Sequence, residues 1–174
     1  MQHASKRKEF LNPGDFLFAE SGTHIHTLLG SCIAITLWHP YLHIGGMCHF
    51  VLPSRPYGEP NLSDKPNGRY ADEAMQLFEL AAELHRTQLS EYEVKIFGGA
   101  DVVNGLDHQQ QRSIGEKNTA KAIELLTARK VPIVTAHVGE SGSRRIVLDL
   151  DSGDVWVKHI AGDGHKVAST SGIN

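Results

Sequence analysis

The sequence has little cysteine, few aromatic residues and no long apolar run. Its 174 residues include two cysteines, Cys32 and Cys48, and 7% aromatic residues. Two cysteines are too few for a disulfide scaffold, and they lack the CxxC spacing of a structural zinc site, so we expect reduced thiols. Because no apolar run approaches the roughly 18 residues that span a bilayer, membrane insertion is not expected.

The sequence also has no large excess of positive or negative charge. The formal net charge is −3, which leaves no basic surface for nucleic acid. The first ten residues, MQHASKRKEF, are basic, but no apolar segment follows them, so they do not form a secretory signal. A hydrophobic fraction of 40% and a charged fraction of 21% are those of an ordinary globular chain. We therefore expect a cytoplasmic, globular protein that does not bind nucleic acid.

Composition divides the chain into three parts. Residues 1–13 form a polar N-terminal lead, and residues 14–160 carry the periodic apolar patterns of one domain. Residues 161–174 are rich in Gly, Ser, Lys and Thr without an apolar period, so a flexible C-terminal tail is expected. Inside the domain, residues 53–69 are rich in Pro, Gly, Ser and Asn, which predicts a long surface loop.

Strand-like and helix-like periods alternate within the domain, which predicts a mixed α/β fold. Two apolar runs, at residues 31–38 and 42–52, flank the turn HPY in the manner of a β-hairpin. Apolar residues at helical spacing predict helices over residues 70–86 and 116–128. Further strands are expected at residues 15–20, 94–97, 131–138, 145–150 and 155–160, the last two joined by the hairpin signal Asp-Ser-Gly-Asp.

Cys32 lies near the start of the first expected hairpin strand, in the stretch LLGSCIAITLW. The preceding Gly30 permits an unusual backbone path that exposes the next side chains and amides, which suits a nucleophile. The alternative is a core cysteine, since free cysteine is among the most buried residue types. His49 interrupts the second apolar run, and if the two runs pair as a hairpin we expect it to lie near Cys32. Cys48 points to the opposite face and is expected in the core.

A histidine beside a cysteine can take the thiol proton and leave a nucleophilic thiolate. A third polar group usually holds the imidazole tautomer, and the spacing does not rank the upstream candidates. These candidates are Thr23, His24, His26 and Thr27. A zinc site is the alternative to catalysis, because His24-x-His26 together with His49 offers three ligands.

Several segments together resemble the CheD family of chemoreceptor glutamine deamidases. They are LLGSC, GGMCHFVLP, Tyr70-Ala71-Asp72, IFGGA, IGEKN and GSRRIVLDLDSGDVWVK, and the similarity spans residues 14–160. The resemblance implies a layered α/β sandwich with mixed, largely antiparallel sheets, like the catalytic domain of cytotoxic necrotizing factor toxins. It also implies a catalytic Cys, His and Thr, which are Cys32, His49 and Thr27 here, with His26 as the alternative to Thr27.

The resemblance also implies a reaction without metal or other cofactor. Cys32 attacks a receptor glutamine, backbone amides near Gly30 and Ser31 stabilise the oxyanion, and His49 protonates the departing ammonia. The resulting thioester is hydrolysed to glutamate, and a glutamate methyl ester is a second possible substrate. The implied partners are the cytoplasmic domains of methyl-accepting chemotaxis receptors and a CheC-type phosphatase. The alternative function is a non-catalytic adaptor that binds these same partners.

Overall fold

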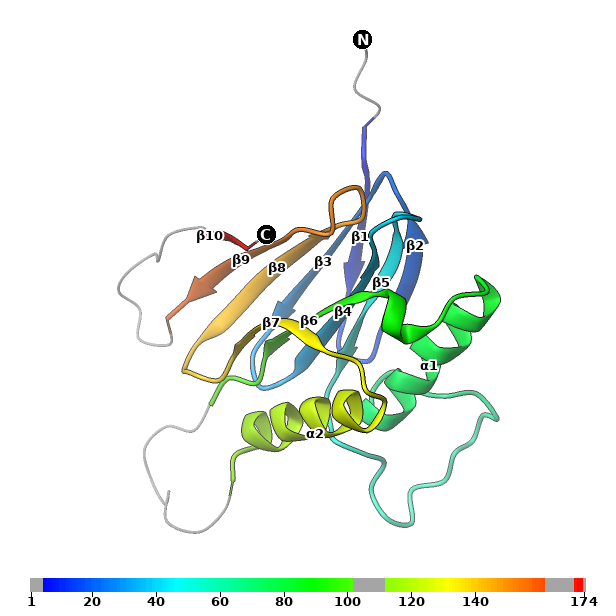
Figure 1. Cartoon of the computed structure of the whole chain (residues 1–174). Coiled ribbons are helices and arrows are strands. Elements are labelled where there is room, and N and C mark those ends of the chain that lie inside the picture. Colours follow the sequence, from blue (N-terminus) through cyan, green and yellow to red (C-terminus); the bar gives the residue numbers. More distant parts are fainter. Residues whose placement is uncertain (1–4, 102–111, 162–170, 174) are drawn as a thin grey trace.

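The computed structural model describes residues 5–101, 112–161 and 171–173, and strands dominate this part of the chain (Figure 1). The first sheet has the order β1 (Arg7–Leu11), β3 (Thr23–Leu29), β8 (Ser143–Asp149), β9 (Val155–Ile160) and β10 (Ser171–Ile173). The second has the order β2 (Phe16–Glu20), β5 (Ile44–Phe50), β4 (Ile33–His39), β6 (Glu93–Gly98) and β7 (Ile133–Val138). The helices described are α1 (Ala71–Leu84), α2 (Ile114–Ala128) and the short 3₁₀ helix η1 (Leu89–Glu91).

The two sheets and the helices confirm the predicted mixed α/β class, and both sheets contain parallel and antiparallel pairs. β1 runs parallel to β3, and β6 runs parallel to β7. The remaining strand pairs described in the two sheets are antiparallel. The implied likeness to the cytotoxic necrotizing factor fold stays a prediction.

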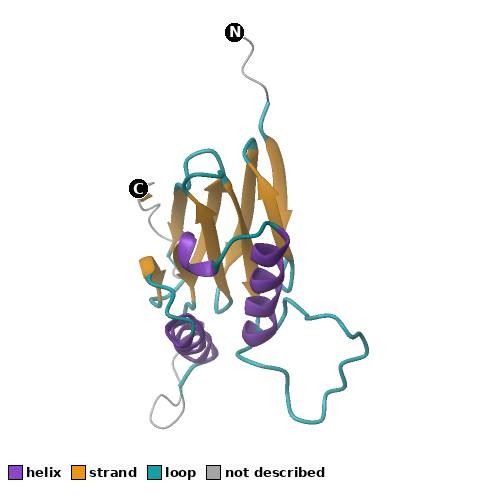
Figure 2. Cartoon of the chain, turned by 45° about the vertical axis from the view of Figure 1, so that its right-hand side comes forward, coloured by secondary structure: helices purple, strands orange, loops and turns teal. Residues whose placement is uncertain are grey.

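The molecule has three layers, because the sheets face each other and both helices cover the outer face of the second sheet (Figure 2). Leu29 and Ile146 of the first sheet pack with Met47 and Phe97 of the second, and all four are fully buried. On the helix side, a second core contains residues from both helices and from β4, β5 and β6. The inner strands β5, β4 and β6 are therefore buried on both faces, and most of their residues are apolar.

The predicted β4–β5 hairpin is confirmed, with shorter strands than expected. The two strands pair antiparallel from Ile33 opposite Phe50 to His39 opposite Ile44. Cys32 therefore precedes the strand instead of lying in it. This matters for the site, because a residue just outside a strand has backbone groups that are not committed to the sheet.

Helix α2 begins two residues earlier than the expected start at residue 116. Ser113 caps it, because its hydroxyl accepts a hydrogen bond from the Glu116 N–H at 3.2 Å. The Glu116 carboxylate accepts a return bond from the Ser113 N–H at 3.0 Å, which completes a capping box. The expected helix at 70–86 is confirmed with slightly narrower bounds, as α1.

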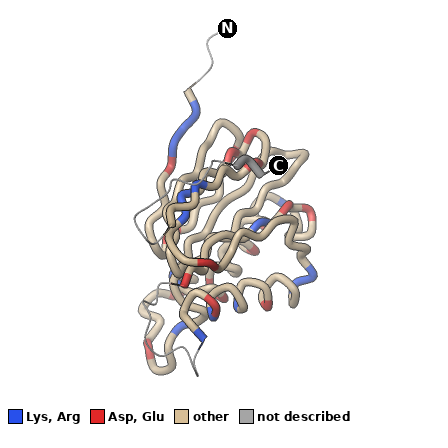
Figure 3. The backbone as a smooth tube through the Cα atoms, turned by 90° about the vertical axis from the view of Figure 1, so that its left-hand side faces the viewer, with Lys and Arg blue, Asp and Glu red and all other residues tan. Residues whose placement is uncertain are grey.

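The first sheet extends beyond the boundaries expected for the domain. β1 lies inside the stretch expected as a polar lead, and its basic start is the blue segment below the N-terminus in Figure 3. Lys6 lies 2.5 Å from Asp149 and 3.0 Å from Asp151, which ties this end of the chain to the β8–β9 turn. β10 lies inside the expected tail, whose residues 162–170 and 174 are outside the described part. No helix in the described segments is long and apolar enough to cross a membrane.

Candidate active site

Cys32 and His49 lie at the open end of the β4–β5 hairpin. Ala34 of β4 is directly opposite His49 of β5. Cys32 precedes the strand and packs against the same core cluster between the sheets as Ala34 and Met47, so its side chain lies on the face that carries His49. Cys48 packs in the core on the helix side, where complete burial raises the pKa of its thiol to about 12. This arrangement therefore brings Cys32 and His49 to one face and places Cys48 on the other.

Thr27 reaches the same place from β3 of the first sheet. Its Oγ1 lies 2.8 Å from His49 Nδ1 and donates a hydrogen bond of 2.9 Å to the carbonyl oxygen of Leu11 in β1. Because the hydroxyl proton is already donated, only a lone pair of Oγ1 is left for the imidazole. Nδ1 of His49 then carries the ring proton, and the lone pair is on Nε2. Thr27 and Leu11 thus fix the tautomer in which the lone pair of the imidazole lies on Nε2.

Burial keeps the His49 imidazole neutral. The residue is 1% exposed, and burial lowers its pKa to about 4, against the smaller opposing effect of the Asp15 charge. Nε2 is buried and has no hydrogen-bond partner within the described part of the chain. A neutral imidazole with an unused Nε2 lone pair can accept a proton at neutral pH.

This burial predicts a pH dependence of stability. The His49 pKa is about 4 in the folded protein, against an ordinary value of 6.5. Between these values the unfolded chain binds more protons than the folded chain. The free energy of unfolding should therefore fall by roughly 3 kcal/mol through this one group as the pH decreases across that window. Urea unfolding across the window measures the slope. The His49→Gln variant should lose this contribution to the pH dependence of the free energy of unfolding. The control variant His43→Gln, at an exposed position, should retain it.

The Cys32 thiol is protonated at rest. Its side chain is half-buried, and burial raises the thiol pKa, while the positive charge of Arg69 acts in the opposite direction without cancelling the rise. Because the His49 pKa is low and the Cys32 pKa is high, the two groups rest as a neutral thiol and a neutral imidazole. An attack by this sulfur would require the thiol proton to move to a base, and His49 can accept it.

The β6–α2 connection holds the backbone around Cys32. The Gly99 N–H donates to the Cys32 carbonyl oxygen, and the Ala100 N–H donates to the Gly30 carbonyl oxygen, both at 2.9 Å. Gly98 has a φ of 109°, and a Cβ at this position would collide with the Cys32 carbonyl oxygen. Glycine is thus required at residue 98 for the connection to approach Cys32 this closely.

Asn118 of α2 holds the peptide that precedes Cys32. Its fully buried Nδ2 donates to the Ser31 carbonyl oxygen at 3.0 Å and to the Val51 carbonyl oxygen at 2.8 Å. The C=O and N–H of a trans peptide point in opposite directions, so fixing the Ser31 carbonyl toward α2 turns the Cys32 N–H away from it. That N–H donates to no other residue in the described segments. It is available to stabilise negative charge on an oxygen bound beside the thiol.

The sequence argument gave no role to Asn118, the last residue of the segment IGEKN, although a signal for one was present. Asn118 lies one turn before Ala122 and two turns before Leu125, on the buried face of α2. An amide in an otherwise apolar helical face must find a specific hydrogen-bond partner inside the protein. That requirement marks the residue as a candidate for positioning nearby backbone.

His24 and His26 lie on the opposite face of β3 from Thr27, because alternate residues of a strand point to opposite sides. The His26 ring stacks on Phe10, with centroids 4.7 Å apart. The structure therefore places Thr27, and not His26, against His49, and it does not assemble the three-histidine zinc site. Among the described residues, no cluster of three or more His, Cys, Asp or Glu side chains is arranged to hold a metal ion.

The chain is similar to known proteins over most of its length. Residues 51–159 match the family described as "CheD chemotactic sensory transduction". The chain is 43% identical to a "Probable chemoreceptor glutamine deamidase CheD 3" of Dechloromonas aromatica, over 94% of each chain. It is 41% identical to a "Probable chemoreceptor glutamine deamidase CheD" of Pseudomonas syringae pv. syringae, over 86% of this chain and 82% of the relative. The solved structure of the hypothetical protein YfiH of Bacillus licheniformis is 9% identical with a TM-score of 0.44, covering 73% of this chain and 50% of that one. Nothing about function follows from so distant a likeness.

Proposed function

The chain belongs to the CheD family, and on this premise we propose that it is a cysteine-dependent deamidase that converts glutamine side chains of chemoreceptors to glutamate. The observation that carries the proposal is the 2.8 Å contact of Thr27 Oγ1 with His49 Nδ1. This contact leaves a buried Nε2 lone pair that has no partner among the described residues, on the face that carries Cys32. The names of the relatives from Dechloromonas and Pseudomonas describe the same activity. Because the substrate glutamines lie in cytoplasmic receptor domains, the proposal places the protein in the cytoplasm.

The first half of the reaction forms a thioester. His49 Nε2 takes the thiol proton as Cys32 Sγ forms a bond to the amide carbon of the glutamine, and the carbonyl electron pair moves onto oxygen. The Cys32 N–H, oriented through Ser31 and Asn118, donates to this oxyanion. The oxyanion then collapses and the C–N bond breaks. The His49 imidazolium gives its proton to the leaving nitrogen, which departs as ammonia.

The second half regenerates the thiol. A water molecule takes the place of ammonia, His49 removes one of its protons, and the oxygen attacks the thioester carbon. The C–S bond breaks, the sulfur recovers its proton from His49, and the product is glutamate. Amide and water are thus converted to carboxylic acid and ammonia without a metal or other cofactor. A glutamate methyl ester would pass through the same thioester, with methanol as the leaving group.

Ammonia release from a purified chemoreceptor cytoplasmic domain tests this function. The parent protein should release ammonia in proportion to the receptor supplied, and the Cys32→Ala variant should release none above background. If the parent binds the receptor domain or a CheC-type phosphatase but releases no ammonia, the protein is an adaptor and the enzymatic proposal is wrong. Circular dichroism of the variant is the control for folding.

The Asn118→Ala variant is expected to lower kcat of receptor deamidation by about ten- to a thousandfold, because the Ser31–Cys32 peptide loses the bond that orients its N–H toward the oxyanion. Alkylation of Cys32 by iodoacetamide needs a thiolate but no oxyanion site, so its rate should change much less. Leu126→Ala, which removes a buried side chain of the same helix, controls for lost stability. Equal losses of kcat and of alkylation rate in Asn118→Ala would contradict the orienting role.

A further inference from the structure

We propose that residues 53–69, which we name the docking loop, form the surface on which the chemoreceptor domain binds while one of its glutamines reaches Cys32. The inference rests on the proposed function and identifies where the protein substrate is recognised. The loop leaves the body of the molecule after β5 and returns to it at the start of α1 (Figure 1, Figure 2). Most of its residues are exposed.

The base of the docking loop borders the candidate active site. The N–H groups of Val51 and Leu52 donate to the Arg69 carbonyl oxygen, at 2.8 and 3.2 Å, so the loop closes two residues beyond His49. Gly68 packs against Gly14, whose N–H donates to the His49 carbonyl oxygen at 2.7 Å. The base of the loop is therefore next to His49, where it can contact a protein that presents a side chain to Cys32.

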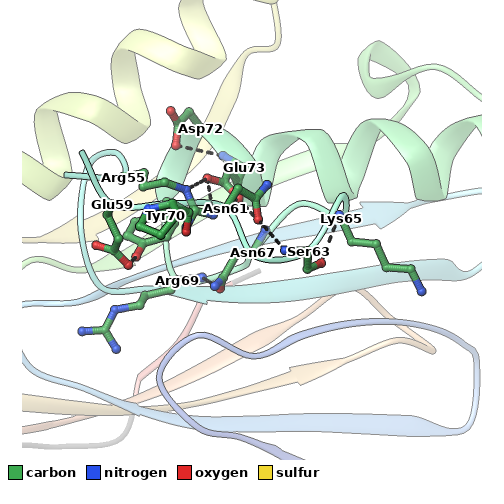
Figure 4. Close-up of polar contacts among 11 residues, drawn as sticks. Arg55, Glu59, Asn61, Ser63, Lys65, Asn67, Arg69, Tyr70, Asp72 and Glu73 are labelled. Carbon is green, nitrogen blue, oxygen red and sulfur yellow. Dashed lines mark hydrogen bonds and ion pairs between the residues drawn. The ribbon is translucent and has the colours of Figure 1, made fainter. Parts of the chain in front are cut away.

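An internal framework holds the loop in one shape (Figure 4). Arg55 donates two hydrogen bonds of 2.9 Å to the Glu73 carboxylate on α1, and both side chains are largely buried. The same carboxylate accepts the Asn67 N–H at 2.7 Å. Tyr70 donates to Glu59 at 2.5 Å, and its ring lies beneath the Arg55 guanidinium. A loop fixed in this way loses little conformational freedom when a partner binds.

The outer side of the loop carries apolar groups that the fold does not use. Tyr57 and Leu62 are almost completely exposed, although the framework beneath them is well packed. Leu62 lines a cavity of about 580 Å³ between the loop and the body, together with Phe16 and Leu77. Exposed tyrosine side chains and apolar side chains that line a cavity, like Tyr57 and Leu62 respectively, are typical anchors of a protein interface.

The positive charge of Arg69, at the base of the docking loop, acts on the Cys32 thiol. The Arg69 side chain is directed away from the Glu73 cluster in Figure 4, and its charge acts to lower the pKa of the Cys32 thiol. Gly14 and Asp15 line the cavity under the loop and hydrogen-bond to the backbone of His49. A surface next to His49 fits the protein substrate better than a second copy of this chain, because a second copy bound there would block substrate access. We therefore assign the docking loop to the chemoreceptor domain.

The double variant Tyr57→Ala/Leu62→Ala tests the assignment. Its matched control is Tyr41→Ala/Leu84→Ala, which removes the same residue types from positions at least 83% exposed, at the far end of the hairpin and at the end of α1. KM for the receptor domain should rise about tenfold or more in the loop variant, with kcat within about twofold of the parent, while the control changes neither. Iodoacetamide alkylation of Cys32 should be equal in all three proteins.

Direct binding keeps the two proposals distinguishable. With Cys32→Ala as the background, so that no turnover occurs, the loop variant should bind the receptor domain about tenfold or more weakly than the control variant. Weaker binding supports the docking loop even if the parent proves catalytically inactive. Equal binding and equal KM overturn the docking loop and leave the deamidase intact. A change from dimer to monomer in the loop variant without a change in KM overturns it in favour of self-association.

Discussion

Replacing Cys32 by serine is expected to reduce deamidation of a chemoreceptor glutamine by at least about a thousandfold, with the fold retained. The hydroxyl is close to the thiol in size, so packing around residue 32 should change little. A hydroxyl is much harder to deprotonate than a thiol, so an imidazole whose pKa is lowered by burial activates it far less well. Initial rates of ammonia release at several receptor concentrations measure the effect.

Cys48→Ala is the matched control for this substitution. Cys48 is the second thiol of the chain, and it packs in the core on the opposite face of β5 from His49. Its removal should lower stability modestly through lost packing and leave kcat near that of the parent. A folded Cys48→Ala protein without activity, or an active Cys32→Ser protein, would contradict the assignment of the nucleophile.

Replacing His49 by glutamine should reduce kcat by about a hundred- to ten-thousandfold. The amide can still contact the Thr27 hydroxyl, but it cannot accept the thiol proton or return it to ammonia. Alkylation of Cys32 by iodoacetamide at neutral pH should also slow, because the thiol loses its base. The pH dependence of that alkylation in the parent and in His49→Gln measures the contribution of the imidazole.

Variants of β3 test how His49 is oriented. Thr27→Val keeps the shape of the side chain but removes the hydroxyl that accepts from His49 Nδ1 and donates to Leu11. It should lower kcat by about tenfold or more, and Thr27→Ser should restore most of the loss. His26→Asn, on the other face of the strand, should leave kcat unchanged. A large loss in His26→Asn with Thr27→Val active would reverse the assignment.

The β4–β5 hairpin was predictable because its signals are local. Two apolar runs around a turn determine the pairing, and the pairing fixes which residues share a face. The amino-acid sequence alone therefore assigns Cys32, His49 and Cys48 to their faces. The expected bounds of β5 were less accurate, because the apolar run at residues 42–52 continues beyond the paired residues Ile44–Phe50 at both ends of the strand.

The contacts of Thr27 and Asn118 could not be predicted from local pattern. Thr27 reaches His49 only because β3 belongs to the other sheet, and the packing of two sheets is set by the whole core. β1 was missed because it is largely exposed and polar, yet it supplies the Leu11 carbonyl that orients the Thr27 hydroxyl. Asn118 donates to Val51, 67 positions earlier in the sequence, and to Ser31, 87 positions earlier. No local sequence pattern predicts contacts between residues so far apart.

Isotope incorporation into the receptor domain tests the central claim most directly. A receptor domain incubated with the parent protein in ¹⁸O-labelled water should gain about three daltons at specific glutamines, since the amide nitrogen is replaced by one labelled oxygen. In ordinary water the gain should be about one dalton, and with Cys32→Ser it should be absent in both. Unchanged receptor masses with the parent, or the same gains with Cys32→Ser, would contradict a thiol-dependent deamidase.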